Sequence, residues 1–151
     1  MVFFKKNWRW FAATWIAFVF VQSLFFKFAG SHETQHIFGV LGEFLGMAWF
    51  AAYGGYIIGG LELVASVLLF LRFWPWGALL AFEIMSGAIV FHLFTPLGVV
   101  MPAFDEMGSK VGDDGGVLFI MACITWVCSL ALVVKDVTAE ESLIRSVLPR
   151  R

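Results

Sequence analysis

Hydrophobic residues run through the chain in four long stretches, separated by short segments that hold most of its polar residues. A helix needs about 20 mostly apolar residues to cross a hydrocarbon core about 30 Å thick. We therefore predict four membrane-spanning helices, over residues 8–28, 49–73, 76–97 and 115–134. Continuous apolar runs, unlike the alternating segments of a membrane barrel, argue against strands. The predicted fold is an all-α transmembrane four-helix bundle with a short interfacial helix between the first two spans, one domain over residues 1–151.

The composition agrees with a membrane protein. Hydrophobic residues make up 61% of the 151 residues and charged residues only 14%, whereas a soluble domain is about a quarter charged. A net charge of -1 carries no basic patch of the kind that nucleic-acid binding needs. We therefore expect membrane lipid, and no nucleic acid, among the partners.

The basic residues predict the orientation. With the amino terminus inside, Lys27 and Lys110 lie outside, and the other Lys and Arg residues lie on the cytoplasmic side, as the positive-inside rule requires. These are Lys5, Lys6, Arg9, Arg72, Lys135, Arg145, Arg150 and Arg151. Both termini are then cytoplasmic. The first apolar run exceeds the roughly 7–15 residues of a secretory signal, so we predict that it is retained as a span.

Glu62 stands alone inside the second apolar stretch. An ionisable residue at membrane depth costs about 2.5–3.5 kcal/mol and marks a functional site or a buried partnership. Gly55, Gly59 and Ser66 share its helical face, and Gly55 and Gly59 form a small-xxx-small pair that lets another backbone approach. Glu62 is therefore predicted to point into the bundle. It is either a protonated acid bonded to a neighbouring helix or a group that binds a ligand or handles a proton.

The third span adds Glu83 and, on the opposite helical side, His92. From the rise per residue, Glu83 and Glu62 lie roughly 10 and 16 Å above the inner end, so they could form one inner polar layer. His92 lies near the level of Gln22 and Lys27, which predicts a second, outer layer. His92 is either a neutral, hydrogen-bonded imidazole or a ligand-binding group.

Residues 32–36 read His-Glu-Thr-Gln-His and match H-E-x-x-H, a motif that on a helix turns two imidazoles to one side for zinc. His32 and His36 are therefore candidate metal ligands. Glu43 falls on the same face, but on a straight helix it stands roughly 10 Å beyond His36, too far for a third ligand bond. The alternative is an interfacial helix with a polar start and an apolar side, formed by Ile37, Phe38, Leu41, Phe44 and Leu45.

Several segments resemble the DoxX-like family of small four-helix bacterial membrane proteins. They are residues 25–31 (FFKFAGS), 60–66 (GLELVAS), 85–93 (MSGAIVFHL), and 114–120 (DGGVLFI) running on to 127–130 (VCSL). Lys27, Glu62, His92 and Asp114 are the positions that the resemblance marks as characteristic. At His32 the resemblance leads us to expect a proline, and His36 is particular to this chain. The resemblance implies a multi-pass protein of the bacterial inner (cytoplasmic) membrane.

The resemblance also implies a link to quinone-dependent redox systems. The chain shows no haem-ligand pair, flavin fingerprint or iron-sulfur cysteine set. We therefore expect an accessory subunit of a membrane redox complex rather than a complete enzyme. In such a subunit a quinone is the candidate cofactor, and Glu62 and Glu83 would handle a proton. The alternative is a stand-alone binder or carrier of a small apolar molecule, with the same carboxylates at the bottom of a cavity open to the outer side. Other membrane subunits or further copies of the chain are the expected partners, and whether the protein is itself an enzyme stays open.

Overall fold

The computed structural model describes the backbone of residues 2–147 and the side chains of residues 7–147, and this part of the chain forms six helices and one small hairpin. The elements, in chain order, are α1 (Val2–Ala29), α2 (His32–Leu45), α3 (Ala48–Phe70), α4 (Trp74–Phe94), β1 (Pro102–Phe104), β2 (Lys110–Asp113), α5 (Val117–Val137) and α6 (Leu143–Val147).

Four of these helices are long and apolar enough to cross a membrane: Asn7–Ala29, Ala48–Phe70, Trp74–Phe94 and Val117–Val137. The four long apolar helices that the sequence predicts are confirmed, and each of their ends lies within three residues of the predicted position. The third span ends at Phe94 rather than at residue 97, because Thr95 is already extended and its hydroxyl bonds the carbonyl of Phe91. Pro75 lies in the first turn of α4, where proline's missing N–H leaves no helix bond unmade.

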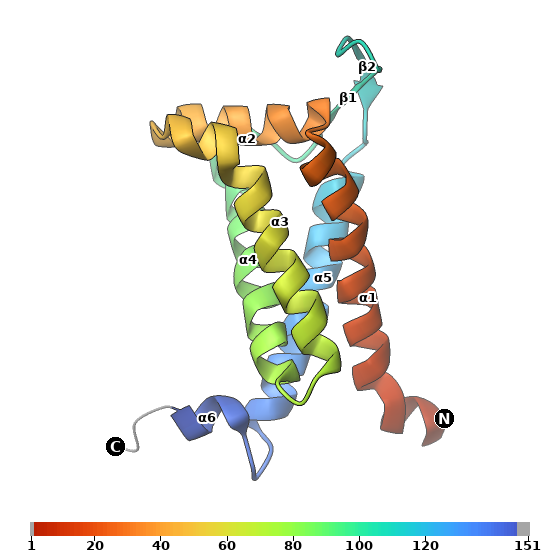
Figure 1. The fold of residues 1–151 in the computed structure, drawn as a ribbon. Coiled ribbons are helices and arrows are strands. Elements are labelled where there is room, and N and C mark those ends of the chain that lie inside the picture. Colours follow the sequence, from red (N-terminus) through yellow and green to blue (C-terminus); the bar gives the residue numbers. More distant parts are fainter. Residues whose placement is uncertain (1, 148–151) are drawn as a thin grey trace.

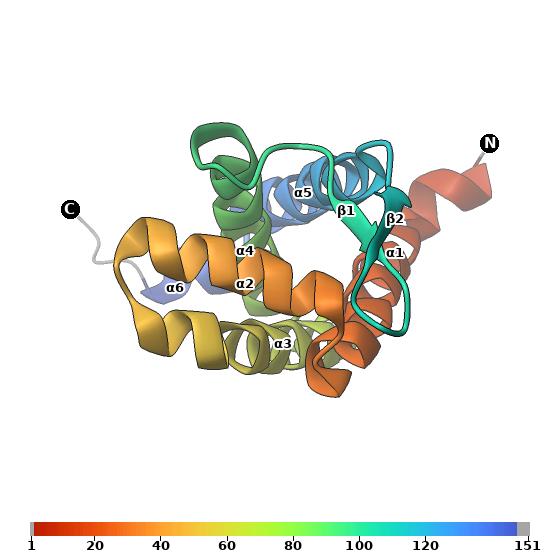
Figure 2. The same ribbon diagram turned by 90° about the horizontal axis from the view of Figure 1, so that it is seen from above.

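The four long helices form a bundle, and α2 lies across one of its ends (Figure 1). Helices α1 and α4 each pack against both α3 and α5, so α1 and α4 occupy opposite corners, as the view along the bundle shows (Figure 2). The start of α1, the α3–α4 turn and α6 lie together at the other end. We call these two ends of the bundle the α2 end and the α6 end.

Small residues let the helices approach closely in the core. Ala65 and Leu69 of α3 face Ala78 and Ala81 of α4, and all four are fully buried. A Cβ on Gly77 would lie 2.8 Å from the backbone nitrogen of Leu69, so only glycine fits there. The predicted close approach of another backbone at Gly55 and Gly59 is wrong, because side chains fill the space beside both glycines. The side chains of Thr34 and Phe38 lie against Gly55, and those of Phe28 and Leu24 lie against Gly59.

Helix α2 has a start and an end that its sequence explains. Ser31 caps the first turn by accepting a hydrogen bond from the backbone N–H of Thr34, and serine is among the preferred residues at this position. Gly46 ends the helix in the left-handed conformation, with φ at 66°, which glycine adopts without a steric penalty. The short helix predicted between the first two spans is thus present, and it buries Phe38 and Leu41, whereas Phe44 and Leu45, which were assigned to its apolar side, are exposed.

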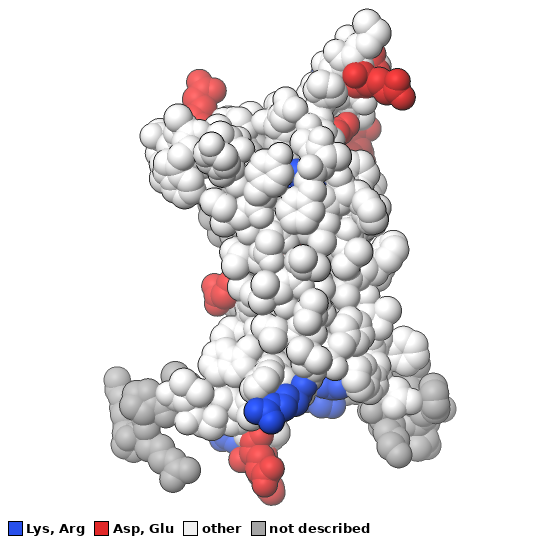
Figure 3. All heavy atoms as spheres, viewed as in Figure 1, with Lys and Arg blue, Asp and Glu red and all other residues white. Residues whose placement is uncertain are grey.

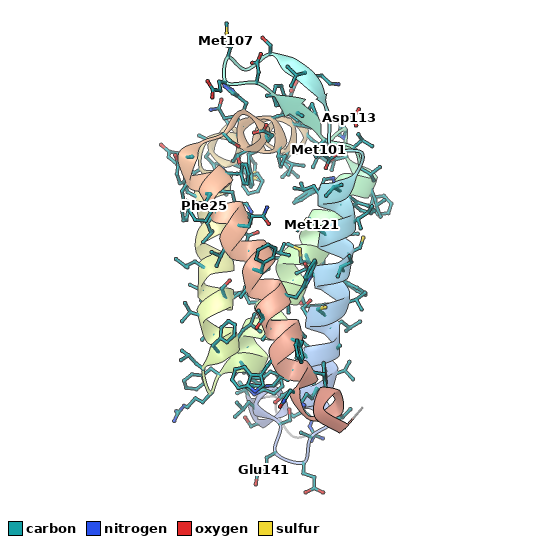
Figure 4. The ribbon with its side chains drawn as sticks, turned by 90° about the vertical axis from the view of Figure 1, so that its right-hand side faces the viewer. Phe25, Met101, Met107, Asp113, Met121 and Glu141 are labelled. Carbon is teal, nitrogen blue, oxygen red and sulfur yellow. The ribbon has the colours of Figure 1, made fainter. Side chains whose placement is uncertain are left out.

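A two-stranded hairpin stands above the α2 end and was not predicted. Strands β1 and β2 pair antiparallel, and an irregular register between Ala103 and Phe104 leaves Val111 unpaired. The Asp105 carboxylate closes the turn by accepting bonds from the N–H groups of Met107 and Ser109. Met107 is at the tip of the hairpin, 88% exposed (Figure 4).

Charged side chains lie mainly at the two ends of the bundle (Figure 3). In the part of the chain that the structure describes, Arg9, Arg72 and Lys135 belong to the α6 end, and Lys27 to the α2 end. This grouping agrees with the residues that the positive-inside rule places together. Arg150 and Arg151 lie outside the described residues, as do the side chains of Lys5 and Lys6. The side of the membrane that each end faces stays a prediction.

Candidate functional site

A buried ion pair joins α1 to α3. The Lys27 ammonium group lies 2.8 Å from Oε1 and 2.6 Å from Oε2 of Glu62. Ser23, one helical turn before Lys27, accepts a bond from Nζ at 2.9 Å and donates to Oε2 of Glu62 at 2.7 Å. The Glu62 side chain is 3% exposed and that of Lys27 is 16% exposed. Glu62 therefore points into the bundle, as predicted, but its partner is a cation rather than a neutral group.

This triangle of polar groups is internally satisfied. An ammonium group has three hydrogens to donate, and Nζ of Lys27 has three acceptors within 2.9 Å. Both oxygens of Glu62 accept at least one bond. Such an arrangement offsets the desolvation of two buried charges, whereas removal of either charge leaves the other unpaired. The site is therefore preorganised, and the three hydrogens of the ammonium group are already matched by three acceptors.

A cavity of about 250 Å³ opens beside Lys27 at the α2 end. Three elements line it: the end of α1, the first half of α2 and the beginning of α3. Lys27 is the only charged residue among the described lining residues, which are Lys27, Gly30, Thr34, Gln35, Phe38, Ala51, Ala52, Gly55 and Tyr56. The absence of a Cβ on Gly55 leaves room for Thr34 and Phe38, whose side-chain atoms would lie 3.0 and 3.5 Å from it.

Glu83 does not join this site. Its side chain is exposed on the outward face of α4 and forms no hydrogen bond or ion pair with the described residues. Val90, on the same helical face, is also half exposed. The predicted inner layer of Glu62 and Glu83 is therefore wrong. The sequence correctly groups Glu83 with Val90 on one face of the helix, but the grouping does not show whether that face packs against the bundle.

The three residues of the predicted outer layer, Gln22, Lys27 and His92, do not lie together either. His92 is buried, and its Nδ1 lies 2.6 Å from the carbonyl oxygen of Gly98, so Nδ1 is the donor. Its ring packs edge-on against Phe119 of α5. Gln22 is exposed on the outward side of α1. His92 thus ties the loop after α4 to the bundle, which fits the expected hydrogen-bonded imidazole, and Lys27 alone of the predicted layer reaches the cavity.

The H-E-x-x-H segment supports the hairpin. His32 and His36 both contact the ring of Phe104, with ring centroids 6.3 and 5.8 Å apart. Oε1 of Glu33 accepts a bond from the backbone N–H of Phe104 at 3.3 Å. Within the described residues no three His, Cys, Asp or Glu side chains lie together as metal ligands, and α2 runs unbroken past Gly39 and Gly42, which keeps Glu43 away from the two imidazoles.

Asp114, the last of the residues marked by the family resemblance, begins α5. Its carboxylate accepts bonds from the N–H groups of Gly116, Leu118 and Met101. Desolvation, the largest single influence, raises the pKa of Asp114, but these hydrogen bonds to its charged form together lower the pKa below its ordinary value. Asp114 therefore fixes the path of the hairpin into α5 and lies apart from the cavity.

Ser23 is the residue of the site that the sequence analysis missed. It lies four residues before Lys27 and so on the same helical face, which is a signal that could have been used. The cavity-lining residues of α2, such as Thr34, could not be found in this way, because their position depends on how α2 folds back over the bundle.

Comparisons of the chain with protein-family models, with curated proteins and with solved structures find no match. The resemblance to DoxX-like proteins accordingly stays a prediction.

Proposed function

We propose that the protein binds the head group of a small, largely apolar molecule in the cavity beside Lys27, as the quinone-site accessory subunit of a redox complex in the bacterial inner membrane. The observation that carries this proposal is the position of one preorganised ammonium group at the edge of an otherwise uncharged cavity, inside a bundle of membrane-spanning helices. The cavity is smaller than the roughly 300–1,000 Å³ that drug-sized ligands occupy. A single ring fits that size, with an apolar tail left to lie along the helices.

The residues present suit a quinone. Phe38 and Ala51 offer apolar contact to a ring, and Lys27 offers a charged donor to a carbonyl oxygen. A quinone in this place would accept electrons that other subunits supply. Lys27 would hold its oxygen, and Glu62 would keep the ammonium group paired throughout. Ser23, released from Lys27, would still donate to Glu62.

A photoreactive short-chain quinone tests this proposal in native membranes. We expect labelling within residues 27–56, and about a tenfold loss of labelling affinity in Lys27→Met, which corresponds to about 1.4 kcal/mol. Lys110→Met is the matched control, because Lys110 is an exposed lysine of the hairpin and its loss should change nothing. Labelling on another part of the chain, or labelling that Lys27→Met leaves unchanged, would contradict the proposal.

The second candidate function is a stand-alone binder or carrier of a small apolar molecule. The same cavity favours it, since nothing in the cavity requires electron transfer. Native mass spectrometry of the gently extracted protein separates the two candidates. Stoichiometric redox subunits support the accessory role, and a homo-oligomer or single copy that carries a small molecule supports the binder.

A further inference from the structure

Two polar side chains face outward from the middle part of the bundle without a partner. Gln22 on α1 and Glu83 on α4 are exposed, lie within candidate spans, and form no hydrogen bond or ion pair with the described residues. Hydrocarbon offers a polar group no hydrogen bonds, and ionisable residues within a membrane almost always face a bundle interior or a partner. In Figure 3 an acidic group stands out on an otherwise uncharged flank.

The two side chains lie at similar depth. At the α6 end, Trp10 stacks on Phe70, and Arg9 lies over the ring of Trp74, so the lower parts of α1 and α4 are level. Measured from the Arg9–Trp74 contact, Gln22 is thirteen residues above Arg9, about 19.5 Å, and Glu83 is nine residues above Trp74, about 13.5 Å. The difference of about 6 Å is slightly more than one helical turn, and two long side chains can bridge it.

Their chemistry is complementary. A carboxylic acid offers one O–H donor and an oxygen acceptor, and a glutamine amide offers two N–H donors and an oxygen acceptor. The two groups can therefore exchange a pair of hydrogen bonds, which satisfies both in an environment without water. Membrane helices associate through interhelical hydrogen bonds of this kind and through close packing at small residues.

The surroundings of both residues allow close packing. Gly87 lies one turn above Glu83 on the same face, and a Cβ built on it meets nothing within 4 Å. Beside Gln22, Phe18 and Phe25 are 57% and 73% exposed, and Phe25 projects from α1 in Figure 4. The face of α4 thus lacks a side chain at about the depth of Gln22, where the face of α1 offers large rings.

We propose that the protein associates with itself in the membrane, with Gln22 of one copy bonded to Glu83 of the next. Because α1 and α4 occupy opposite corners of one bundle, a single copy cannot form this bond internally. All copies share one membrane orientation, so the contact is heterologous and joins copies head to tail into a ring or a row. The contact lies apart from the cavity, and it does not depend on what the cavity binds.

Disulfide cross-linking tests which faces meet. Phe25→Cys and Val90→Cys, in a background of Cys123→Ala and Cys128→Ala, keep Gln22 and Glu83 intact, and they place thiols about 22 and 24 Å above the α6 end. When differently tagged copies are co-expressed and oxidised in the membrane, we expect a disulfide between Phe25→Cys and Val90→Cys. Val127→Cys, on the exposed face of α5, is the control and should cross-link with neither. A Val90→Cys homodimer alone, or no cross-link, would overturn the proposal.

Association measured by energy transfer between labelled copies tests the bond itself. Glu83→Leu and Gln22→Leu should each weaken association about tenfold, or about 1.4 kcal/mol, and the double variant should be no weaker than either one. Independent effects that multiply to about a hundredfold would show that the residues do not meet. Gly87→Leu should also weaken association, whereas Gly60→Leu, at an equally open glycine of α3, should not. Unchanged association in Gly87→Leu would likewise contradict the proposal.

Discussion

At the scale of single residues, Lys27 and Glu62 decide how α1 meets α3. Burial of either charge alone in a low-dielectric interior would cost free energy, and the opposite charge 2.6 Å away offsets this desolvation cost. Ser23 completes the hydrogen bonding of both groups. One pair thus both holds two helices together and presents an ammonium group to the cavity.

We expect Lys27→Met to lower the free energy of unfolding by about 3 kcal/mol, because it leaves a carboxylate buried without its cation. The double variant Lys27→Met/Glu62→Gln should recover much of this loss, since no unpaired charge remains. Reversible unfolding in mixed detergent micelles measures both variants. If the single and double variants are equally destabilised, Glu62 does not carry a charge that needs Lys27.

Glu62→Gln separates the structural role of the residue from its part in binding. The amide keeps the shape and can still accept from Lys27 and Ser23, but it cannot balance the ammonium charge. We expect the fold to persist, with a smaller loss of stability than in Lys27→Met, and quinone labelling to change. Unchanged labelling in a normally folded variant would make Glu62 a purely structural residue.

The sequence predicted the inward position of Glu62 because Gly55, Gly59 and Ser66 mark one buried helical face. The sequence did not predict that Lys27 is the partner of Glu62. Heights calculated along straight helices had placed Lys27 in the outer layer and Glu62 in the inner one. Glu83 was misplaced for a related reason: Gly87 and Val90 share its helical face, but this face points away from the bundle. Periodicity groups residues on a face, and only packing decides which face is buried.

At the scale of elements, α3 and α4 pack with their backbones in close contact at Gly77. Gly77→Ala would place a Cβ within 3 Å of backbone atoms of Leu69 and Ala65, so the helices would have to separate. We expect a loss of about 1–3 kcal/mol in unfolding free energy. Gly87→Ala is the matched control in the same helix, because its Cβ would meet open space, and it should leave stability nearly unchanged.

The hairpin and its supports respond to acid. The pKa of Glu33 is lowered, chiefly by a hydrogen bond from its own backbone N–H and further by the bond from Phe104, and the pKa of Asp114 is lowered as described above. A carboxyl group whose pKa is lower in the folded state stabilises the fold at neutral pH, and this contribution is lost as the pH falls through the folded pKa. Both groups should therefore stay charged to a lower pH than ordinary Glu and Asp side chains, which titrate near about pH 4.

We accordingly expect hydrogen exchange in residues 102–113 to be slow at pH 7 and to increase, after correction for the intrinsic rate, as the pH falls below about 4. Asp114→Asn should show the faster exchange already at pH 7, because a neutral amide oxygen accepts the three N–H bonds less strongly. Asp113→Asn is the control, since the Asp113 side chain accepts one hydrogen bond within the described residues, from Gly115. Equal exchange in both variants would contradict this role of Asp114.

The four spans could be predicted because length and apolar composition suffice to define a membrane helix. The hairpin could not, because β1 and β2 are only three and four residues long and are stabilised in part by contacts with α2, far away in sequence. The H-E-x-x-H segment illustrates the same limit. Its residues form the predicted helix, but their neighbours come from β1, which the pattern does not indicate.

At the scale of the whole molecule, the hairpin tip and the segment before α6 stand at opposite ends of the bundle (Figure 4). In intact cells, a membrane-impermeant maleimide should label Met107→Cys and leave Glu141→Cys unlabelled until the membrane is opened. This expectation follows from the positive-inside rule, which places the α6 end in the cytoplasm. Labelling of Glu141→Cys in intact cells would reverse the orientation.

The pairing of Lys27 with Glu62 also sets an order of events during biosynthesis. Lys27 enters the membrane with the first span, when the ribosome has not yet made the third element of the bundle. Until Glu62 follows, the ammonium group depends on its long side chain reaching the interface, as lysines near helix ends do. A nascent chain that stops before residue 62 therefore keeps an uncompensated cation at the end of its first span.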